Sequence, residues 1–167
     1  MMVAALDVYY KDDRAKAVAL LFSWADEKGL TPFVHFLDHI EPYVPGEFYK
    51  RELPCLLAVI GQLDLDNIDA LIIDGHVYVD DSYTHGLGGR LWQALEEKIP
   101  IIGVAKTSFR NNAATVVEVY RGGSHRPLFV SAIGMDGQLA ADRVENMAGE
   151  YRIPEVLKEL DRVTRMF

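Results

Sequence analysis

The sequence lacks the features that define several large classes of protein. Its 167 residues include one cysteine, Cys55, so no intramolecular disulfide can form, and there is no Cys-x-x-Cys pair to bind zinc. No apolar run is long enough to span a membrane, and no basic segment precedes a long apolar stretch as in a secretory signal. We therefore expect a protein of a reducing compartment, by default the cytoplasm, that makes no membrane contact.

Basic residues are also scarce. The chain has 17 Lys and Arg against 25 Asp and Glu, which gives a net charge of -8. Broad non-specific attraction to nucleic acid depends on basic side chains that displace counterions, so the composition argues against it. It does not exclude a nuclease, because carboxylates gathered around metal ions are neutralised in the working site.

The composition is that of a globular protein. Half of the residues are hydrophobic and a quarter are charged, which leaves little room for disorder. The length suits one ordinary domain, and no linker, repeat or low-complexity tract divides it. We expect a single domain over residues 1–167.

The first forty residues have the pattern of an antiparallel meander. Residues 3–10 and 15–25 are apolar segments on either side of the charged turn KDDR, which predicts a hairpin. DEKGL, at 26–30, is a second turn signal, and residues 31–40 alternate as a third strand would, although their periodicity also permits a helix.

The rest of the chain alternates between helical and strand patterns. Pro54 suits the first turn of a helix that extends to about Leu63, because proline has no backbone N–H to leave unpaired. We predict buried strands at 70–75 and 101–106, a hairpin of 116–120 with 127–133, and helices at 85–98, 138–149 and 154–165. A strand, a helix and a strand form a parallel crossover, so the predicted fold class is α/β, with a mixed sheet covered by helices on both faces.

Three acidic residues are the candidates for a metal site. Asp7 lies among apolar residues in the first strand, where a carboxylate needs a partner, and Asp74 ends a buried strand. If these two strands are parallel neighbours, both side chains reach the same edge of the sheet, and Glu52 could join them there. Oxygen ligands of this kind favour Mg²⁺ or Mn²⁺ over zinc. Lys106 ends the next strand and could add a positive charge, so the set suits metal-assisted phosphodiester hydrolysis.

Each of these residues also has a simpler interpretation. Asp7 and Asp74 could be turn residues at strand ends, Glu52 a solvated charge beside a helix, and Lys106 a surface lysine. The spacing alone does not decide between the two interpretations.

Several segments together resemble the endonuclease V family, the deoxyinosine-specific repair nucleases with a ribonuclease H-like fold. They occur in family order and cover most of the chain: DVYY (7–10), PYVPGEFYKRELPCLL (42–57), LIIDG (71–75), HGLGGRLWQALEEKIPIIGVAK (85–106) and GEYRIPEVLKELDRV (149–163). By this resemblance Asp7, Glu52 and Asp74 match the metal-binding acids of the family, and Lys106 matches its lysine.

The resemblance also assigns a role to the loop at 42–46. Tyr43 matches the wedge that parts the strands beside the altered base, and Pro42 and Pro45 restrict the backbone around it. A stiff wedge loses less entropy on binding than a flexible one. The alternative is an aromatic side chain folded back on the core.

Glycines near this loop could form the pocket for an extruded base. In such enzymes the base is turned out of the stack, and glycine lets the main chain come close to it. The candidates are Gly46, Gly75, Gly86 and Gly88. The run GLGG, at 86–89, could equally be only a tight entry to a helix.

The chain departs from the family at two places. Members normally have a histidine after the strand equivalent to 127–133, but neither Gly134 nor Met135 supplies one; Asp136, His76 or His125 could take its place. HVYVDDSYT, after Asp74, lacks the expected His-Pro-Arg pattern and is more acidic.

The resemblance implies a metal-dependent endonuclease that cuts inosine-containing DNA or RNA on the 3′ side of the lesion, leaving a 3′-hydroxyl and a 5′-phosphate. Two other functions stay open: a module that binds inosine-containing nucleic acid without turnover, and a metal-dependent phosphoesterase with a different, smaller substrate.

Overall fold

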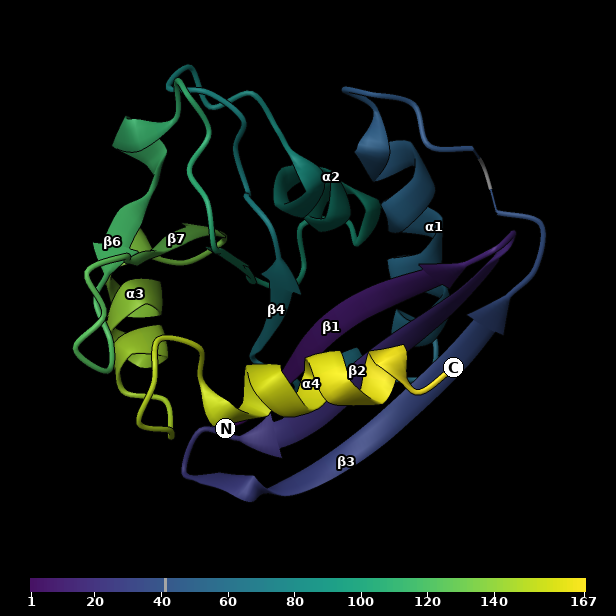
Figure 1. The fold of residues 1–167 in the computed structure, drawn as a ribbon, viewed down its shortest axis with the longest axis horizontal. Helices are drawn as coiled ribbons and strands as arrows, with labels where there is room; N and C mark the ends of the chain where they lie inside the picture. Colours follow the sequence, from purple (N-terminus) through teal and green to yellow (C-terminus); the bar gives the residue numbers. More distant parts are fainter. Residues whose placement is uncertain (41) are drawn as a thin grey trace.

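The computed structural model describes residues 1–40 and 42–167. Figure 1 shows a sheet with helices packed against it. The strands are β1 (Met2–Lys11), β2 (Arg14–Ser23), β3 (Asp26–Leu37), β4 (Ala70–Asp74), β5 (Ile101–Ala105), β6 (Val117–Val119) and β7 (Leu128–Ile133). The α-helices are α1 (Phe48–Ile60), α2 (Leu87–Ala94), α3 (Gly137–Glu145) and α4 (Glu155–Arg165), with short 3₁₀ turns at Leu65–Asn67 and Ala113–Thr115.

All seven strands belong to one mixed sheet with the order β3-β2-β1-β4-β5-β7-β6. The strands β1, β2 and β3 form the predicted antiparallel meander, and β6 and β7 form the predicted hairpin. The pair β4–β5 is parallel, as the crossover pattern indicated, and the pair β1–β4 is parallel as well, which meets the condition set for bringing Asp7 and Asp74 together. The mixed sheet predicted from the sequence is therefore confirmed.

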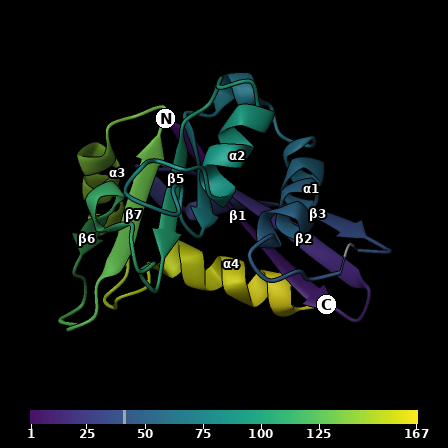
Figure 2. The same ribbon diagram turned by 90° about the horizontal axis from the view of Figure 1, so that it is seen from above.

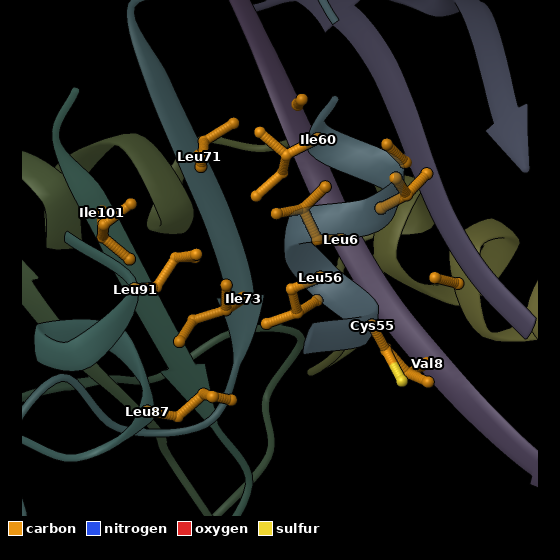
Figure 3. Close-up of a cluster of buried hydrophobic side chains, with 14 of the residues drawn as sticks. Leu6, Val8, Cys55, Leu56, Ile60, Leu71, Ile73, Leu87, Leu91 and Ile101 are labelled. Atoms are coloured by element: carbon orange, nitrogen blue, oxygen red, sulfur yellow. The ribbon is translucent and has the colours of Figure 1, made fainter. Parts of the chain in front are cut away.

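Helices cover both faces of this sheet, and α4 lies on the face opposite to α1 and α2 (Figure 2). Successive side chains of β1 point to opposite faces of the sheet, and the residues on both faces are apolar, which explains this arrangement. Leu6 and Val8 pack in the cluster that contains α1 and α2, shown in Figure 3, whereas Val3 and Ala5 pack in the cluster that contains α3 and α4. A strand with both faces buried is apolar at almost every position.

The prediction for the start of the first helix is wrong. α1 begins at Phe48, so both Glu52 and Pro54 lie inside it. Proline removes one backbone hydrogen bond from a helix, the bond that residue 54 would donate to the carbonyl of Lys50. Pro54 lies on the exposed side of α1, where water can reach that carbonyl, and Cys55 and Leu56 bury the opposite side.

Further boundaries differ from the predicted ones, among them the end of α3, at Glu145 instead of residue 149. Residues 26–30 belong to β3 rather than to a turn, and the pairing of Ser23 with Asp26 leaves only two residues between the strands. α2 ends at Ala94, before the predicted residue 98, because Glu96 and Glu97 adopt φ values of 59° and 60°, which a right-handed helix cannot continue.

Among the described residues, no helix has the length and apolar character that a membrane span requires.

Candidate active site

A cavity of about 180 Å³ opens where the parallel strands end. Its polar lining consists of three acids and two lysines: Asp7, Asp74, Asp161, Lys106 and Lys158. The remaining lining residues are apolar: Leu6, Ile72, Ile73, Val104, Leu128, Ile153, Leu157 and Leu160. Charged and apolar side chains thus line the same cavity, and the apolar surroundings strengthen the electrostatic interactions between the charged groups.

The register of the parallel strands brings the predicted residues together. Leu6 pairs with Ile73, so Asp7 and Asp74 are the next residues on adjacent strands. Asp74 pairs with Val104 of β5, and Lys106 directly follows that strand. The sequence-based expectation that Asp7, Asp74 and Lys106 share one edge of the sheet is confirmed.

Burial and mutual repulsion act on the acids of the cavity. Burial, with the charge of Asp74 as the next cause, raises the pKa of Asp7 to about 6. The pKa of Asp74 is also raised, chiefly because the surrounding protein keeps water from its carboxylate, while the Lys106 ammonium lowers it. Part of the Asp74 residue stays exposed, which moderates this effect. The charge of Asp161 raises the pKa of both. The three carboxylates are therefore close enough to repel one another.

Glu52 approaches from the other face of the sheet. It lies on α1, and the Tyr10 hydroxyl donates a hydrogen bond of 2.6 Å to its Oε2 atom. Burial raises the pKa of Glu52 to about 7, and the charges of Asp7 and Asp74 contribute to this rise. The negative charges of both aspartates therefore act on Glu52. In the described part of the chain, however, no three Asp, Glu, His or Cys side chains are already grouped as ligands of one ion.

The chemistry of these donors fits a hard divalent cation. All are carboxylate oxygens, the ligands that Mg²⁺ and Mn²⁺ prefer, and no thiolate or imidazole lines the cavity in the described structure. Carboxylates that repel one another at neutral pH are stabilised by a positive ion between them. A metal would thus offset the burial and the repulsion that together raise the pKa of Asp7.

Asp161 and Lys158 are site residues that the sequence-based prediction missed. Both lie on α4, which packs across β1 and β2. Asp161 also pairs with Arg165, with 2.9 Å between Oδ1 and Nε. The signal was the segment 149–163, one of those that carry the family resemblance, but its charges fit the solvated face of a helix equally well.

The loop before α1 presents its aromatic residue to solvent. Tyr43 is 59% exposed, so it does not fold back on the core, and Pro42 and Pro45 are exposed beside it. Gly46 has φ +79°, a left-handed conformation that favours glycine. This exposed position is compatible with a role in binding nucleic acid.

Packing accounts for some of the predicted pocket glycines. A Cβ atom on Gly88 would lie 2.8 Å from Val77 Cγ2, and one on Gly86 would lie 3.1 Å from the His76 carbonyl oxygen. Both glycines are buried at the start of α2, as the tight-entry interpretation requires. Gly75 differs, since a Cβ atom there would meet only Leu87 Cδ2, at 4.0 Å, and the residue directly follows Asp74, which lines the cavity.

Comparison with known proteins identifies the family. Residues 1–162 match the family described as Endonuclease V. The chain belongs to the Endonuclease V family.

Individual relatives are similar in sequence and in fold. Endonuclease V of Thermococcus kodakarensis is 33% identical over 108 residues, which cover 65% of this chain and 52% of that protein. The crystal structure of Endonuclease V from Streptomyces avermitilis superposes with a TM-score of 0.76 and 25% identity, covering 99% of this chain and 80% of that one. Ciona intestinalis Endonuclease V, in complex with a 24mer DNA containing an inosine, has a TM-score of 0.76 at 18% identity, with coverage of 98% and 84%.

These similarities confirm the ribonuclease H-like fold. The chain spans about half the length of several curated Endonuclease V relatives that it matches.

The position at which family members were expected to have a histidine lies far from the cavity. β7 is antiparallel to β5, with Ile133 opposite Ile101, so Gly134 and Met135 follow β7 at the opposite edge of the sheet from Asp74. The idea that Asp136 replaces this histidine in the site is wrong, because its carboxylate accepts the Leu139 N–H as the N-cap of α3 at that far edge. The lack of a histidine there removes nothing from the cavity.

The two other histidines considered as substitutes are placed differently. His125 lies exposed in the turn between β6 and β7. His76 is buried, with Nε2 2.8 Å from the Thr107 carbonyl oxygen and Nδ1 3.1 Å from Asn112 Nδ2, and burial lowers its pKa. His76 therefore links the loop after Asp74 to the segments that contain Thr107 and Asn112.

The acidic residues after Asp74 have local structural roles. Asp80 Oδ1 accepts hydrogen bonds from the backbone N–H groups of Ser82 and Thr84. Asp81 Oδ1 accepts one from the N–H of Ala114. These hydrogen bonds stabilise the loops next to the site, and the backbone N–H dipoles partly offset the negative charge of the two carboxylates.

Proposed function

We propose that this protein is a metal-dependent endonuclease that hydrolyses a phosphodiester on the 3′ side of inosine in DNA or RNA. The observation that carries the proposal is the meeting of Asp7, Asp74 and Asp161 with Lys106 and Lys158 around one cavity at the end of the parallel strands. Membership of the Endonuclease V family and the inosine-containing DNA bound by the Ciona relative support the substrate.

We assign Mg²⁺, with Mn²⁺ as a substitute, to the acids. Asp7 and Asp74 would hold it, Asp161 lies close enough to contribute, and Glu52 would complete the site or orient water. When bound, the metal supplies a polarised water and charge stabilisation for the phosphoryl oxygens. A cation bound by the acids would also explain how an acidic site can accept a polyanion, because the positive charge offsets the repulsion between carboxylate and phosphate.

The basic and aromatic residues would act on the nucleic acid itself. Lys106 and Lys158 project positive charge at the cavity, where they would bind the phosphate and offset its growing negative charge. Tyr43, exposed on its loop, would stack on or push against a base, and Gly75 would let the backbone approach the extruded inosine.

The direct test is cleavage of a labelled strand with a single inosine, with and without Mg²⁺. We expect Mg²⁺-dependent cutting on the 3′ side of the inosine, and at least a 100-fold loss in Asp74→Asn, since removal of one electrostatic stabiliser commonly costs a factor of about 10²–10³. Asp66→Asn, an exposed aspartate in the 3₁₀ turn before β4, is the matched control. Full activity in Asp74→Asn would remove Asp74 from the mechanism.

A phosphoesterase acting on a small nucleotide is the second candidate. The net charge of -8 and the cavity of about 180 Å³ favour it, because a small substrate needs no extended basic surface. Turnover of free nucleotides without preference for inosine strands would support this candidate. Tight binding of inosine strands without Mg²⁺-dependent cutting would instead indicate a binding module.

We also propose the cytoplasm as the compartment, because the sole cysteine, Cys55, is a buried free thiol.

A further inference from the structure

Two hydroxyl groups lie against two of the proposed metal-binding acids. The Tyr10 hydroxyl, on β1, donates to Glu52 Oε2 at 2.6 Å. The Thr164 hydroxyl, on α4, is 3.2 Å from Asp7 Oδ2. Each hydroxyl contacts one carboxylate oxygen, and the Asp7 carboxylate also accepts a hydrogen bond from the backbone of Val8, so these contacts restrict how each group can turn.

The Tyr10 side chain is held in place from its other side. The Arg51 guanidinium stacks on the Tyr10 ring, with 3.6 Å from Cζ to the ring centroid. Arg51 and Glu52 are neighbours on α1, so one of them packs on the face of the Tyr10 ring and the other binds its hydroxyl. This packing limits the orientations of the Glu52 carboxylate.

The Thr164 side chain is held just as firmly. It is 1% exposed, and its hydroxyl also lies within hydrogen-bond distance of the Leu160 and Asp161 carbonyl oxygens. The end of α4 is fastened to β2 by Lys16, whose Nζ donates to the Val163 and Met166 carbonyl oxygens at 2.6 and 2.7 Å. The Thr164 hydroxyl is therefore held in place beside Asp7, and its one hydrogen is shared between the Asp7 carboxylate and the two carbonyl oxygens.

We propose that Tyr10 and Thr164 are positioning residues, which hold the Glu52 and Asp7 carboxylates in the orientations that receive a divalent cation. The inference rests on the proposed metal-dependent function. Neither residue touches the metal or the substrate; each acts through the carboxylate that it contacts. Hydrogen-bond partners of metal ligands typically change metal affinity by 10–100-fold when they are removed.

The test measures Mn²⁺ binding by electron paramagnetic resonance, which reports free Mn²⁺ without any need for turnover. Tyr10→Phe and Thr164→Val each remove a hydroxyl and keep the size of the side chain, and we expect each to weaken Mn²⁺ binding about 10-fold. Thr164→Ser keeps the hydroxyl and should bind as the wild type does. Cleavage of an inosine strand should recover in Tyr10→Phe and Thr164→Val when Mn²⁺ is raised to saturation.

Two remote variants are matched controls. Tyr120→Phe removes a tyrosine hydroxyl that donates to a glutamate, Glu118, at the sheet edge formed by β6. Ser124→Ala removes a hydroxyl that donates to the Arg126 carbonyl oxygen in the turn between β6 and β7. Neither should alter Mn²⁺ affinity, and circular dichroism of all variants separates folding from binding.

The outcomes separate this inference from the function on which it rests. If the wild type binds Mn²⁺ and Tyr10→Phe and Thr164→Val bind it equally well, the positioning role is wrong and the metal site stands. A serine variant as weak as the valine variant would show that the Thr164 methyl group matters instead, which overturns the role of its hydroxyl. If the wild type binds no Mn²⁺, the proposed function and this inference both fail.

Discussion

At the scale of single residues, available space decides which side chains can start α2. Gly88 is buried on the first turn of this helix, against the backbone and side chain of Val77. A methyl group there would lie 2.9 Å from Val77 Cα, an atom that cannot rotate away. The loop after Asp74 is therefore positioned by close helix packing, independently of any ligand.

Gly88→Ala should consequently destabilise the protein. We expect a loss of about 1–3 kcal/mol in the free energy of unfolding, the usual cost of overpacking a core. Gly137→Ala is the control, because a Cβ atom on Gly137, at the start of α3, would meet no heavy atom within 4 Å. Urea unfolding should show that this control is neutral or stabilised by up to about 1 kcal/mol. Equal stability of the two variants would contradict the packing argument.

Lys106 offers a second test at this scale, because it should affect catalysis and metal binding differently. Its ammonium lowers the pKa of Asp74 and would stabilise negative charge on the phosphate. Lys106→Met should reduce the cleavage rate roughly 100-fold. It should not weaken Mn²⁺ binding, since the variant removes a cation that repels the metal.

The comparison requires rates at saturating Mn²⁺ together with a direct binding titration. Lys28→Met, on the exposed part of β3, is the control and should leave both unchanged. A Lys106→Met protein that no longer binds Mn²⁺ would show that the lysine supports the metal site instead of the phosphate.

Residue-level prediction from the sequence succeeded where the local pattern was unusual. Asp7 stands out because it interrupts a strand that is otherwise buried, and Asp74 because it ends one. Asp161 does not stand out, since an acid among Glu159 and Arg162 is typical of any exposed helical face. Only the packing of α4 across β1 brings it to the cavity, and that contact is not visible in the local sequence.

At the scale of elements, one buried arginine organises the approach to α4. Arg121, after β6, is 6% exposed and has no carboxylate within hydrogen-bond distance in the described structure. Its guanidinium donates instead to backbone carbonyls between α3 and α4, including those of Met147 at 2.6 Å and Tyr151 at 3.0 Å. Burial lowers the pKa of Arg121, but an arginine remains charged in proteins.

Arg121→Met should therefore loosen this segment. The lost charge-assisted hydrogen bonds leave several carbonyls without a donor, and we expect a cost of about 3 kcal/mol in the free energy of unfolding. Hydrogen exchange should rise first in residues 145–152 and in α4. Arg126→Met, in the exposed turn after Arg121, should change stability by less than about 0.5 kcal/mol. Unchanged exchange in α4 would show that Arg121 does not hold this helix.

The order of elements was readable from the sequence, but some boundaries were not. Apolar runs bounded by turns identified the strands, because burial on both faces leaves a continuous signal. The start of α1 was misplaced because Pro54 suggests a first turn, whereas burial of Cys55 and Leu56 favours a helix that passes through it. Tertiary packing here outweighs the lost hydrogen bond of one proline.

At the scale of the whole molecule, a few of the 25 acidic residues lie where their negative charge costs stability. Burial is the main cause that raises the pKa values of Asp7 and Glu52, to about 6 and about 7, and repulsion between the acids adds to it. Both residues keep some solvent exposure, which moderates the energy involved. The folded protein thus holds protons at pH values where the unfolded chain has already released them.

Stability should therefore fall as pH rises through the range of about 4–7 in the absence of metal. A group with a raised pKa in the folded state contributes stability that is full below its unfolded pKa and lost as pH rises through its folded pKa.

His76, with a lowered pKa, acts in the opposite direction below about pH 6.5, so the wild type must be compared with an Asp7→Asn/Glu52→Gln double variant. We expect the double variant to gain roughly 1–3 kcal/mol relative to the wild type between pH 5 and pH 8, as measured by urea unfolding at each pH. Saturating Mg²⁺ should stabilise the wild type more at pH 8 than at pH 5, because ionised acids bind it better, and should not stabilise the double variant. A constant difference between the two proteins across this pH range would show that these acids are not protonated by the fold.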